Sequence, residues 1–183
     1  MIRRNPLPRL WLMTDERVGA TLWAALGRLP PGSGVVVRHH ATPAAERRRL
    51  ILRVRRIATA RRLVVVVAGG ATGAGIHGPG RKSGHGAGLR TWPAHDRRQA
   101  IAGIRAGARL LFVSPIFATR SHPGAPTLGP AKAAMVAARL PAAAVALGGM
   151  TPRRFVRLRR WGFDGWAAID ALSEGQKRKA VPT

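Results

Sequence analysis

Hydroxyl, guanidinium and imidazole groups lie together in a loop near the middle of the sequence. The apolar segment 110–113, LLFV, has the length of a buried strand, and the loop after it carries Thr119, Arg120, Ser121 and His122. In α/β proteins, loops at the carboxyl ends of strands carry the binding and catalytic groups, because the strands form a rigid platform beneath them. We therefore expect this loop to bind a ligand, although capping of the loop explains Thr119 and Ser121 equally well.

A glycine pair, Gly148 and Gly149, follows the apolar segment 143–147 and comes shortly before Pro152, where a helix can begin. Backbone amides in such a turn approach a phosphate closely, and the dipole of the following helix favours an anion. The alternative is a plain strand-to-helix turn without a ligand. The position of the pair at the end of a strand favours phosphate binding.

Eight short apolar segments with the length of strands must position these groups. They lie at residues 9–14, 35–37, 63–67, 76–77, 89–92, 110–113, 143–147 and 165–169. Helical patterns separate most of them, at residues 20–29, 44–60, 96–106, 132–139, 152–161 and from 171 onward. This alternation predicts parallel βα units, and eight strands predict a compact, closed (β/α)₈ TIM barrel of the α/β class. A doubly wound open sheet is the other option, but its G-x-G-x-x-G phosphate motif is absent after the first strand.

The length of 183 residues suits a single domain, residues 1–183, with a basic tail at about 175–183. This length is short for a (β/α)₈ barrel, so at least one βα unit must be trimmed. We expect the trimmed unit after the third strand, where residues 68–75 read AGGATGAG instead of a helical pattern.

The chain carries 32 Lys and Arg residues against 7 Asp and Glu residues, a formal net charge of +25. Such an excess can indicate a nucleic-acid partner, because phosphate neutralisation dominates that kind of binding. The arginines are spread along helical segments such as 46–62 and 153–160, however, and aromatic residues are sparse. We interpret the charge as a solvated basic surface that binds nucleic acids non-specifically at low salt.

The composition excludes several kinds of site. Without cysteine, the chain has no disulfide, thiol catalyst or thiolate metal site, which fits a reducing compartment. No apolar run approaches the length of a membrane span, and the N-terminal segment lacks the hydrophobic core of a signal peptide. We therefore expect a cytoplasmic protein without a membrane partner, and the sequence leaves a homo-oligomer open.

Six motifs, in order, resemble the thiamine phosphate synthases and the related thiazole tautomerases. They are LWLMTD at 10–15, VRHH at 37–40, GIH at 75–77, the segment 107–119 that ends in PIFAT, VALGGM at 145–150 and GFDGWAAI at 162–169. The resemblance implies a transferase of thiamine biosynthesis. Such an enzyme joins hydroxymethylpyrimidine diphosphate to thiazole phosphate, both phosphorylated small molecules, and releases pyrophosphate.

The resemblance also implies roles for individual residues. Arg38 and His40 fall at two positions of the family's R-E-K motif, and His122 replaces the lysine that ends its T-x-T-K loop. We expect these three catalytic residues to take up the charge of the leaving pyrophosphate. The expected substrate-binding residues are Thr119, Ser121, Gly148, Gly149, Ile169 and Asp170.

The aspartates that carry Mg²⁺ in this family have no counterpart here, because the corresponding turns read VAG at 67–69 and GPGR at 78–81. We therefore assign no metal ligand and expect Mg²⁺ to enter only through the phosphates of a substrate. Two alternatives to the synthase stay open. One is a thiazole tautomerase-like enzyme that moves protons with histidine, and the other is a non-catalytic barrel that binds a phosphorylated ligand.

Other conspicuous residues have structural explanations. Hydrogen-bonded structural roles are expected for His77, His85 and His95. At most one of His39 and His40 can face the site if the strand continues through them, because successive strand residues face opposite sides. Asp15 can hold an arginine beneath the barrel mouth as readily as it can do chemistry. We expect Trp161 and Trp166 in the core.

Overall fold

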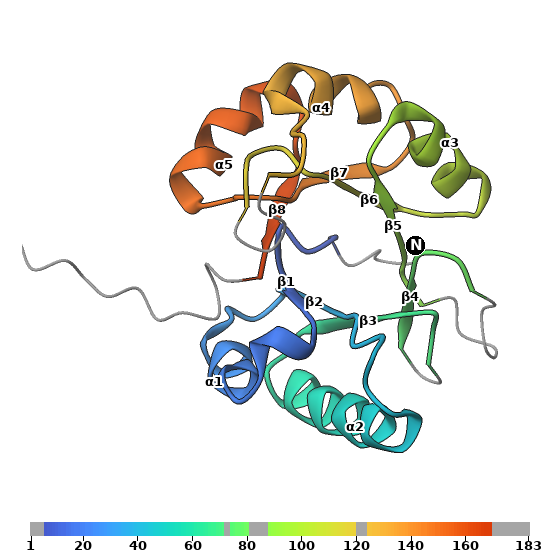
Figure 1. Ribbon diagram of the computed structural model, residues 1–183, viewed down its shortest axis with the longest axis vertical. Helices are drawn as coiled ribbons and strands as arrows, with labels where there is room; N and C mark the ends of the chain where they lie inside the picture. The colour runs from blue at the N-terminus through green and yellow to red at the C-terminus, as the bar shows by residue number, and fades with distance from the viewer. Residues whose placement is uncertain (1–5, 72–73, 81–87, 120–123, 170–183) are drawn as a thin grey trace, which may run out of the picture.

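The computed structural model describes residues 6–71, 74–80, 88–119 and 124–169. Within these ranges, eight parallel strands pair in sequence order and close into a barrel, with β8 hydrogen-bonded to β1 (Figure 1). The strands are β1 (Leu10–Thr14), β2 (Gly34–Val37), β3 (Val64–Ala68), β4 (Gly75–His77), β5 (Arg90–Ala94), β6 (Leu110–Val113), β7 (Ala143–Ala146) and β8 (Gly165–Ala168). The closed barrel confirms the predicted (β/α)₈ fold and excludes the open sheet.

Helices pack around the outside of the barrel. In the described part of the chain they are α1 (Thr21–Arg28), α2 (Ala44–Ala60), α3 (Arg97–Arg105), α4 (Gly129–Ala137), α5 (Pro152–Leu158) and the 3₁₀ helices η1 (Glu16–Val18) and η2 (Arg159–Trp161). Asp96 caps α3, because its Oδ1 accepts a hydrogen bond of 2.7 Å from the Gln99 amide. α4 begins at Gly129, before the predicted start at residue 132, since Pro130 needs no amide partner in the first turn of a helix.

The helix layer is incomplete beside β4. No helix occurs between β3 and β5 among the residues that the structure describes, and Figure 1 shows β4 between α2 and α3 without a helix of its own. The buried Arg90 side chain of β5 donates hydrogen bonds to the carbonyls of Gly78 at 3.2 Å and Gly80 at 3.0 Å. Arg90 thereby fixes the start of the segment after β4. β3 ends at Ala68 and β4 already begins at Gly75, which confirms the trimmed unit after the third strand.

Side chains fill the barrel interior, so the barrel is a packed core rather than a pore. The buried interior residues are Trp11, Met13, Val36, Val66, Leu110, Phe112, Val145 and Ala167. The rings of Trp11 and Phe112 meet edge to face with centroids 5.3 Å apart. Trp166 is buried under the helices, as expected. The expectation for Trp161 is wrong: its side chain is 41% exposed, because η2 carries it on the outer side of the helix layer.

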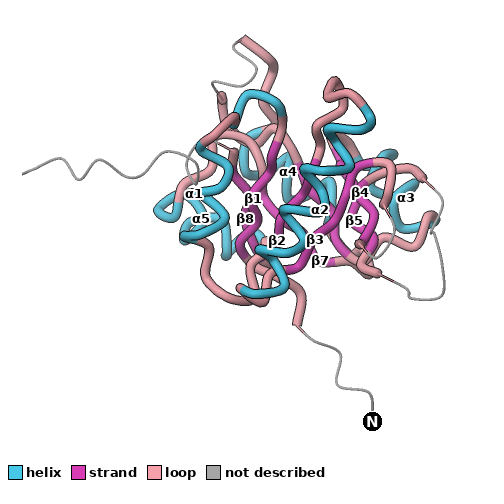
Figure 2. Tube along the Cα trace, turned by 90° about the horizontal axis from the view of Figure 1, so that it is seen from below, coloured by secondary structure: helices cyan, strands magenta, loops and turns pink. Residues whose placement is uncertain are grey.

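Parallel strands present their carboxyl ends at one end of the barrel, which we call the mouth. Figure 2 shows the strands side by side, with loops gathered at their ends. The segments that follow β1, β2, β4, β6, β7 and β8 therefore meet at the mouth, where most of the predicted site residues lie. None of the helices in the described ranges has the length and apolar character needed to cross a membrane.

Candidate functional site

An ion-pair cluster lies at the mouth, after β1 and β2. The Asp15 carboxylate is 2.7 Å from the Arg38 guanidinium and 2.5 Å from that of Arg17. Arg38 also donates a hydrogen bond of 3.3 Å to the Thr14 carbonyl. Burial raises the pKa of Asp15, but the two arginines outweigh this effect and hold the pKa below its ordinary value. Asp15 therefore stays ionised and fixes Arg38 at the mouth.

The two histidines after β2 have different surroundings. His39 is buried, and its Nδ1 shares a hydrogen bond of 3.2 Å with the Thr14 hydroxyl, whereas His40 is exposed. Arg47 of α2 donates to the carbonyls of His39 at 3.0 Å and Ala68 at 2.7 Å. It ties the end of β2 to the end of β3, a role that sequence reasoning missed. Of this pair, His40 is the one that is accessible to a ligand.

His77 of β4 lies inside the barrel, just below the mouth. Its Nδ1 shares a hydrogen bond of 2.9 Å with the Thr91 hydroxyl, and its ring meets the Phe112 ring at a centroid distance of 5.4 Å. Burial, with a smaller contribution from the positive charges of Arg38 and His40, lowers the pKa of His77 to about 4. The imidazole is therefore neutral at neutral pH. Its hydrogen bond confirms the structural role that we expected.

The lowered pKa of His77 makes stability depend on pH. The folded protein keeps this imidazole neutral down to about pH 4, whereas an unfolded histidine gains its proton near pH 6.5. The stability that the neutral His77 contributes should be fully present above pH 6.5 and be lost on acidification through this interval, which lowers the free energy of unfolding by at most roughly 3 to 4 kcal/mol. In the variant His77→Asn, urea unfolding should show a smaller loss of the free energy of unfolding over the same pH interval. The remainder would come from His39, whose pKa burial also lowers. An equal loss in both proteins would contradict the assignment.

The Gly148–Gly149 turn after β7 packs against the loop after β6. The two glycines have positive φ angles of 95° and 59°. The Gly148 carbonyl accepts a hydrogen bond of 3.2 Å from the Phe117 amide. A side chain on Gly149 would collide with the Ala118 carbonyl. The two segments that were predicted separately as ligand-binding, the loop and the glycine turn, therefore form one structural unit.

The amides of this turn are candidate donors to a ligand. Gly148 is buried, yet neither its N–H nor that of Gly149 donates to an acceptor within the described ranges. Arg154 of α5 lies beside them: its guanidinium donates to the Gly149 carbonyl and stacks over the Phe117 ring at 4.6 Å. Sequence reasoning missed Arg154, whose only signal was its place in the helix that follows the glycine pair. A buried N–H without an acceptor is costly, and an anion would satisfy it.

The other predicted site residues fall into two groups. Thr119 directly follows Ala118, which lies against Gly149, so the structure brings Thr119 next to the glycine turn. Ile169 follows β8, is partly buried and packs against the barrel interior. Outside the described residues lie Ser121, His122, Asp170 and His85, whose roles stay predictions.

The side chains at the mouth do not fit a protein-held Mg²⁺. Within the described ranges, no group of three His, Asp or Glu residues is arranged to hold a metal ion. Asp15 is already occupied by Arg17 and Arg38. His95, after β5, is engaged by the Ser114 carbonyl, 2.8 Å from its Nδ1, which confirms its expected hydrogen-bonded role.

Residues 91–172 match the family model for thiamine monophosphate synthase. This segment runs from β5 through β8 and contains the loop after β6 and the glycine turn, but not Arg38. No curated protein sequence matches the chain at a significant level.

Solved structures of similar fold include two thiamine phosphate pyrophosphorylases. The protein from Pyrococcus furiosus has a TM-score of 0.73 at 16% identity, over 93% of this chain and 89% of its own. The protein from Bacteroides thetaiotaomicron has a TM-score of 0.59 at 16% identity, over 94% and 89% of the two chains. A KDPGal structure has a TM-score of 0.59 at 18% identity, over 92% and 85%. At these identities the likeness establishes the barrel fold.

Proposed function

We propose that this chain, which the match over residues 91–172 supports as a member of the thiamine phosphate synthase family, joins hydroxymethylpyrimidine diphosphate to thiazole phosphate and releases pyrophosphate. The family match and the two pyrophosphorylase structures support an enzyme of the thiamine-biosynthesis type. The choice of substrates is our proposal. It rests on a mouth that offers amide donors after β7 and a fixed guanidinium after β2.

The Gly148 amide, which has no acceptor within the described ranges, is the observation that carries this proposal. A buried donor without an acceptor is rare in proteins, because it costs about as much as a lost hydrogen bond. A phosphate oxygen would satisfy this donor. Thr119 lies next to this turn and can add a hydroxyl. We assign the thiazole phosphate to this side of the mouth.

The proposed reaction breaks the bond between the pyrimidine methylene carbon and a diphosphate oxygen and forms a bond from that carbon to the thiazole nitrogen. Negative charge grows on the departing diphosphate. A guanidinium already fixed in place stabilises that charge more in the transition state than in the bound substrate. Arg38, held by Asp15, supplies this group. His40 is proposed to assist when protonated, and His122 is proposed for the same task.

The tautomerase-like alternative needs a histidine that exchanges a proton at neutral pH. Burial lowers the pKa of His77 to about 4, which makes His77 a weak base there. A tautomerase would therefore have to use another histidine of the mouth, such as His40. The family match and the two pyrophosphorylase structures favour the transferase, and a non-catalytic barrel that binds a phosphorylated ligand is the alternative that the experiment must separate from it.

Calorimetric titration of the purified protein with thiamine phosphate and with pyrophosphate, each with and without Mg²⁺, tests the proposal. We expect both ligands to bind, and pyrophosphate to need Mg²⁺, because the ion would enter with the phosphates. Incubation with both substrates should then release pyrophosphate. Binding without turnover would indicate the non-catalytic barrel, and failure of both ligands to bind would contradict a phosphate site at the mouth.

A further inference from the structure

Exposed arginines gather on the side of the barrel that carries α5 and η2. Arg153, Arg157, Arg159 and Arg160 are exposed, and none of their side chains has a hydrogen-bond or ion-pair partner within the described ranges. Figure 1 places α5 on the opposite side of the barrel from α2, which carries another set of arginines. The positive charge beside α5 is therefore unneutralised by the described part of the chain.

Among the acidic side chains that the structure describes, four have partners of their own, and Glu46 lies on α2. Asp15 pairs with arginines at the mouth, and Glu16 accepts a hydrogen bond of 2.7 Å from the Ala41 amide. Asp96 caps α3. Asp164 lies near η2, but its carboxylate accepts a hydrogen bond of 2.8 Å from the Ala144 amide. A partner that neutralises the arginines must bring its own negative charge.

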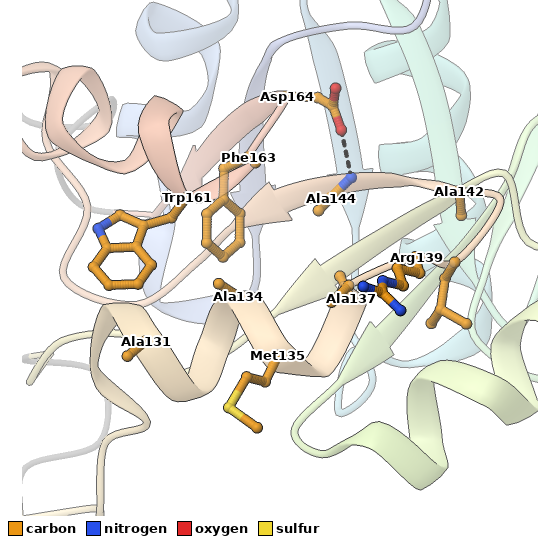
Figure 3. A pocket seen from close by; sticks show the side chains of 13 residues that line it. Ala131, Ala134, Met135, Ala137, Arg139, Ala142, Ala144, Trp161, Phe163 and Asp164 are labelled. Atoms are coloured by element: carbon orange, nitrogen blue, oxygen red, sulfur yellow. Dashed lines mark hydrogen bonds between the residues drawn. The ribbon is translucent and has the colours of Figure 1, made fainter.

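A groove of about 520 Å³ lies between α4 and η2, the helix that carries Arg159 and Arg160 (Figure 3). We call it the α4–η2 groove. The residues that line it include Ala134, Met135, Arg139, Trp161 and Phe163, together with Asp164, whose carboxylate is engaged by the Ala144 amide. Figure 3 shows the rings of Trp161 and Phe163 pointing toward α4. Met135 is 70% exposed and Trp161 41%. The groove therefore presents large apolar side chains to solvent, and neighbouring exposed apolar side chains mark binding surfaces.

We propose that the α4–η2 groove binds single-stranded nucleic acid. A base would stack on Trp161, and the neighbouring backbone phosphates would be neutralised by Arg159 and Arg160, which precede it in η2. This site is distinct from the barrel mouth and does not depend on the proposed reaction.

The chemistry of the groove favours this ligand. Proteins that bind single strands combine a positively charged path for the backbone with exposed aromatic rings on which bases stack. Trp161 follows two exposed arginines directly, and Arg139 adds a cation elsewhere along the groove. The alanines of α4 leave a smooth apolar wall, and a groove of this volume is within the range that accepts small organic ligands. A planar base fits such a slot.

A second copy of this chain is a poorer occupant of the groove. Its own charge would be +25, and its arginines would meet those of η2 at close range. A nucleic acid brings one negative charge with each phosphate and is attracted by the same arginines.

Fluorescence anisotropy of an end-labelled oligothymidylate of about ten nucleotides tests the proposal with the full chain. Trp161→Ala should raise the Kd about tenfold, whereas Trp161→Phe, which keeps a stacking ring, should recover most of the affinity. The double variant Arg159→Ala with Arg160→Ala should weaken binding and reduce the salt slope by roughly 1.4, since each phosphate contact contributes about 0.7.

The matched control is the double variant Arg48→Ala with Arg49→Ala on α2, which removes the same charge from exposed positions on the opposite side of the barrel. It should change the Kd by less than about twofold. The proposal would be overturned if both double variants weakened binding equally, or if Trp161→Ala kept its affinity. Either result would indicate non-specific binding to positive charge spread over the whole surface. Tighter Trp161-dependent binding to anionic lipid vesicles than to the oligonucleotide would also overturn it. Thermal melting confirms that each variant is folded.

Discussion

Replacing Arg38 with alanine is expected to lower kcat/KM for the proposed condensation by at least about a hundredfold, the usual effect of removing one group that stabilises transition-state charge. Arg38 lies at the mouth with its guanidinium 2.7 Å from Asp15, so it is positioned before the substrate arrives. The side chain is only 22% exposed, which limits screening by water. Pyrophosphate release is the activity readout, and calorimetry with pyrophosphate reports the loss of affinity.

Arg17→Ala is the matched control, because Arg17 pairs with the same carboxylate but its side chain is 50% exposed. Its loss should change kcat/KM by only a few-fold, as for other exposed ion pairs. If both variants lose activity equally, Asp15 rather than Arg38 is the group that matters. If Arg38→Ala keeps its activity, the charge of the leaving pyrophosphate is stabilised elsewhere.

Gly148→Ala is expected to reduce the free energy of unfolding by about 3 kcal/mol or more and to abolish binding of thiamine phosphate. Two costs add at this position. The φ angle of 95° is strained for alanine, and a Cβ would lie 2.9 Å from the Pro115 Cα and 3.1 Å from the Ile116 amide nitrogen. Because that contact is with backbone, the loop after β6 would have to move. Urea unfolding and calorimetry measure the two effects.

Gly162→Ala isolates the cost of the φ angle. Gly162 also has a positive φ, 83°, but a Cβ there would meet nothing within 4 Å. We expect a loss of about 1 kcal/mol with thiamine phosphate binding intact. Similar losses in the two glycine variants would mean that the loop yields easily, and the glycine turn would then not be a rigid part of the site.

The eight strands were predictable because each is a short apolar segment bounded by polar or turn residues, and their pairing in sequence order follows from the alternation with helices. The α2 bounds, Ala44–Ala60, agree with the prediction because Pro43 precedes the helix and apolar residues recur at helical spacing along it. The incomplete helix layer was visible as glycine in place of a helical pattern. The contact that fixes the segment after β4 was not visible, since Arg90 reaches carbonyls ten and twelve residues away.

The candidate site was also predictable only in part. The loop after β6 and the glycine turn were recognisable from residue types at strand ends. That they form one unit depends on a contact between residues about thirty positions apart, Phe117 and Gly148, which only the closed barrel brings together. The Asp15 to Arg38 pair was foreseen only as the option that Asp15 holds an arginine. The pKa of His77 could not be predicted from the sequence, because it depends on how deeply the barrel interior buries the side chain.

By itself, the sequence determined the parallel barrel, the place where it is trimmed, and which loops gather at its mouth. These properties follow from local hydrophobic period and chain order, which are written in consecutive residues. The tertiary structure alone decided which side chains are fixed, which amides are left without an acceptor and which aromatic ring is exposed. Trp161 shows the reason: a tryptophan in an apolar pattern is expected inside, but the layer that would cover it exists only once α4 and η2 are packed, and there it leaves a groove.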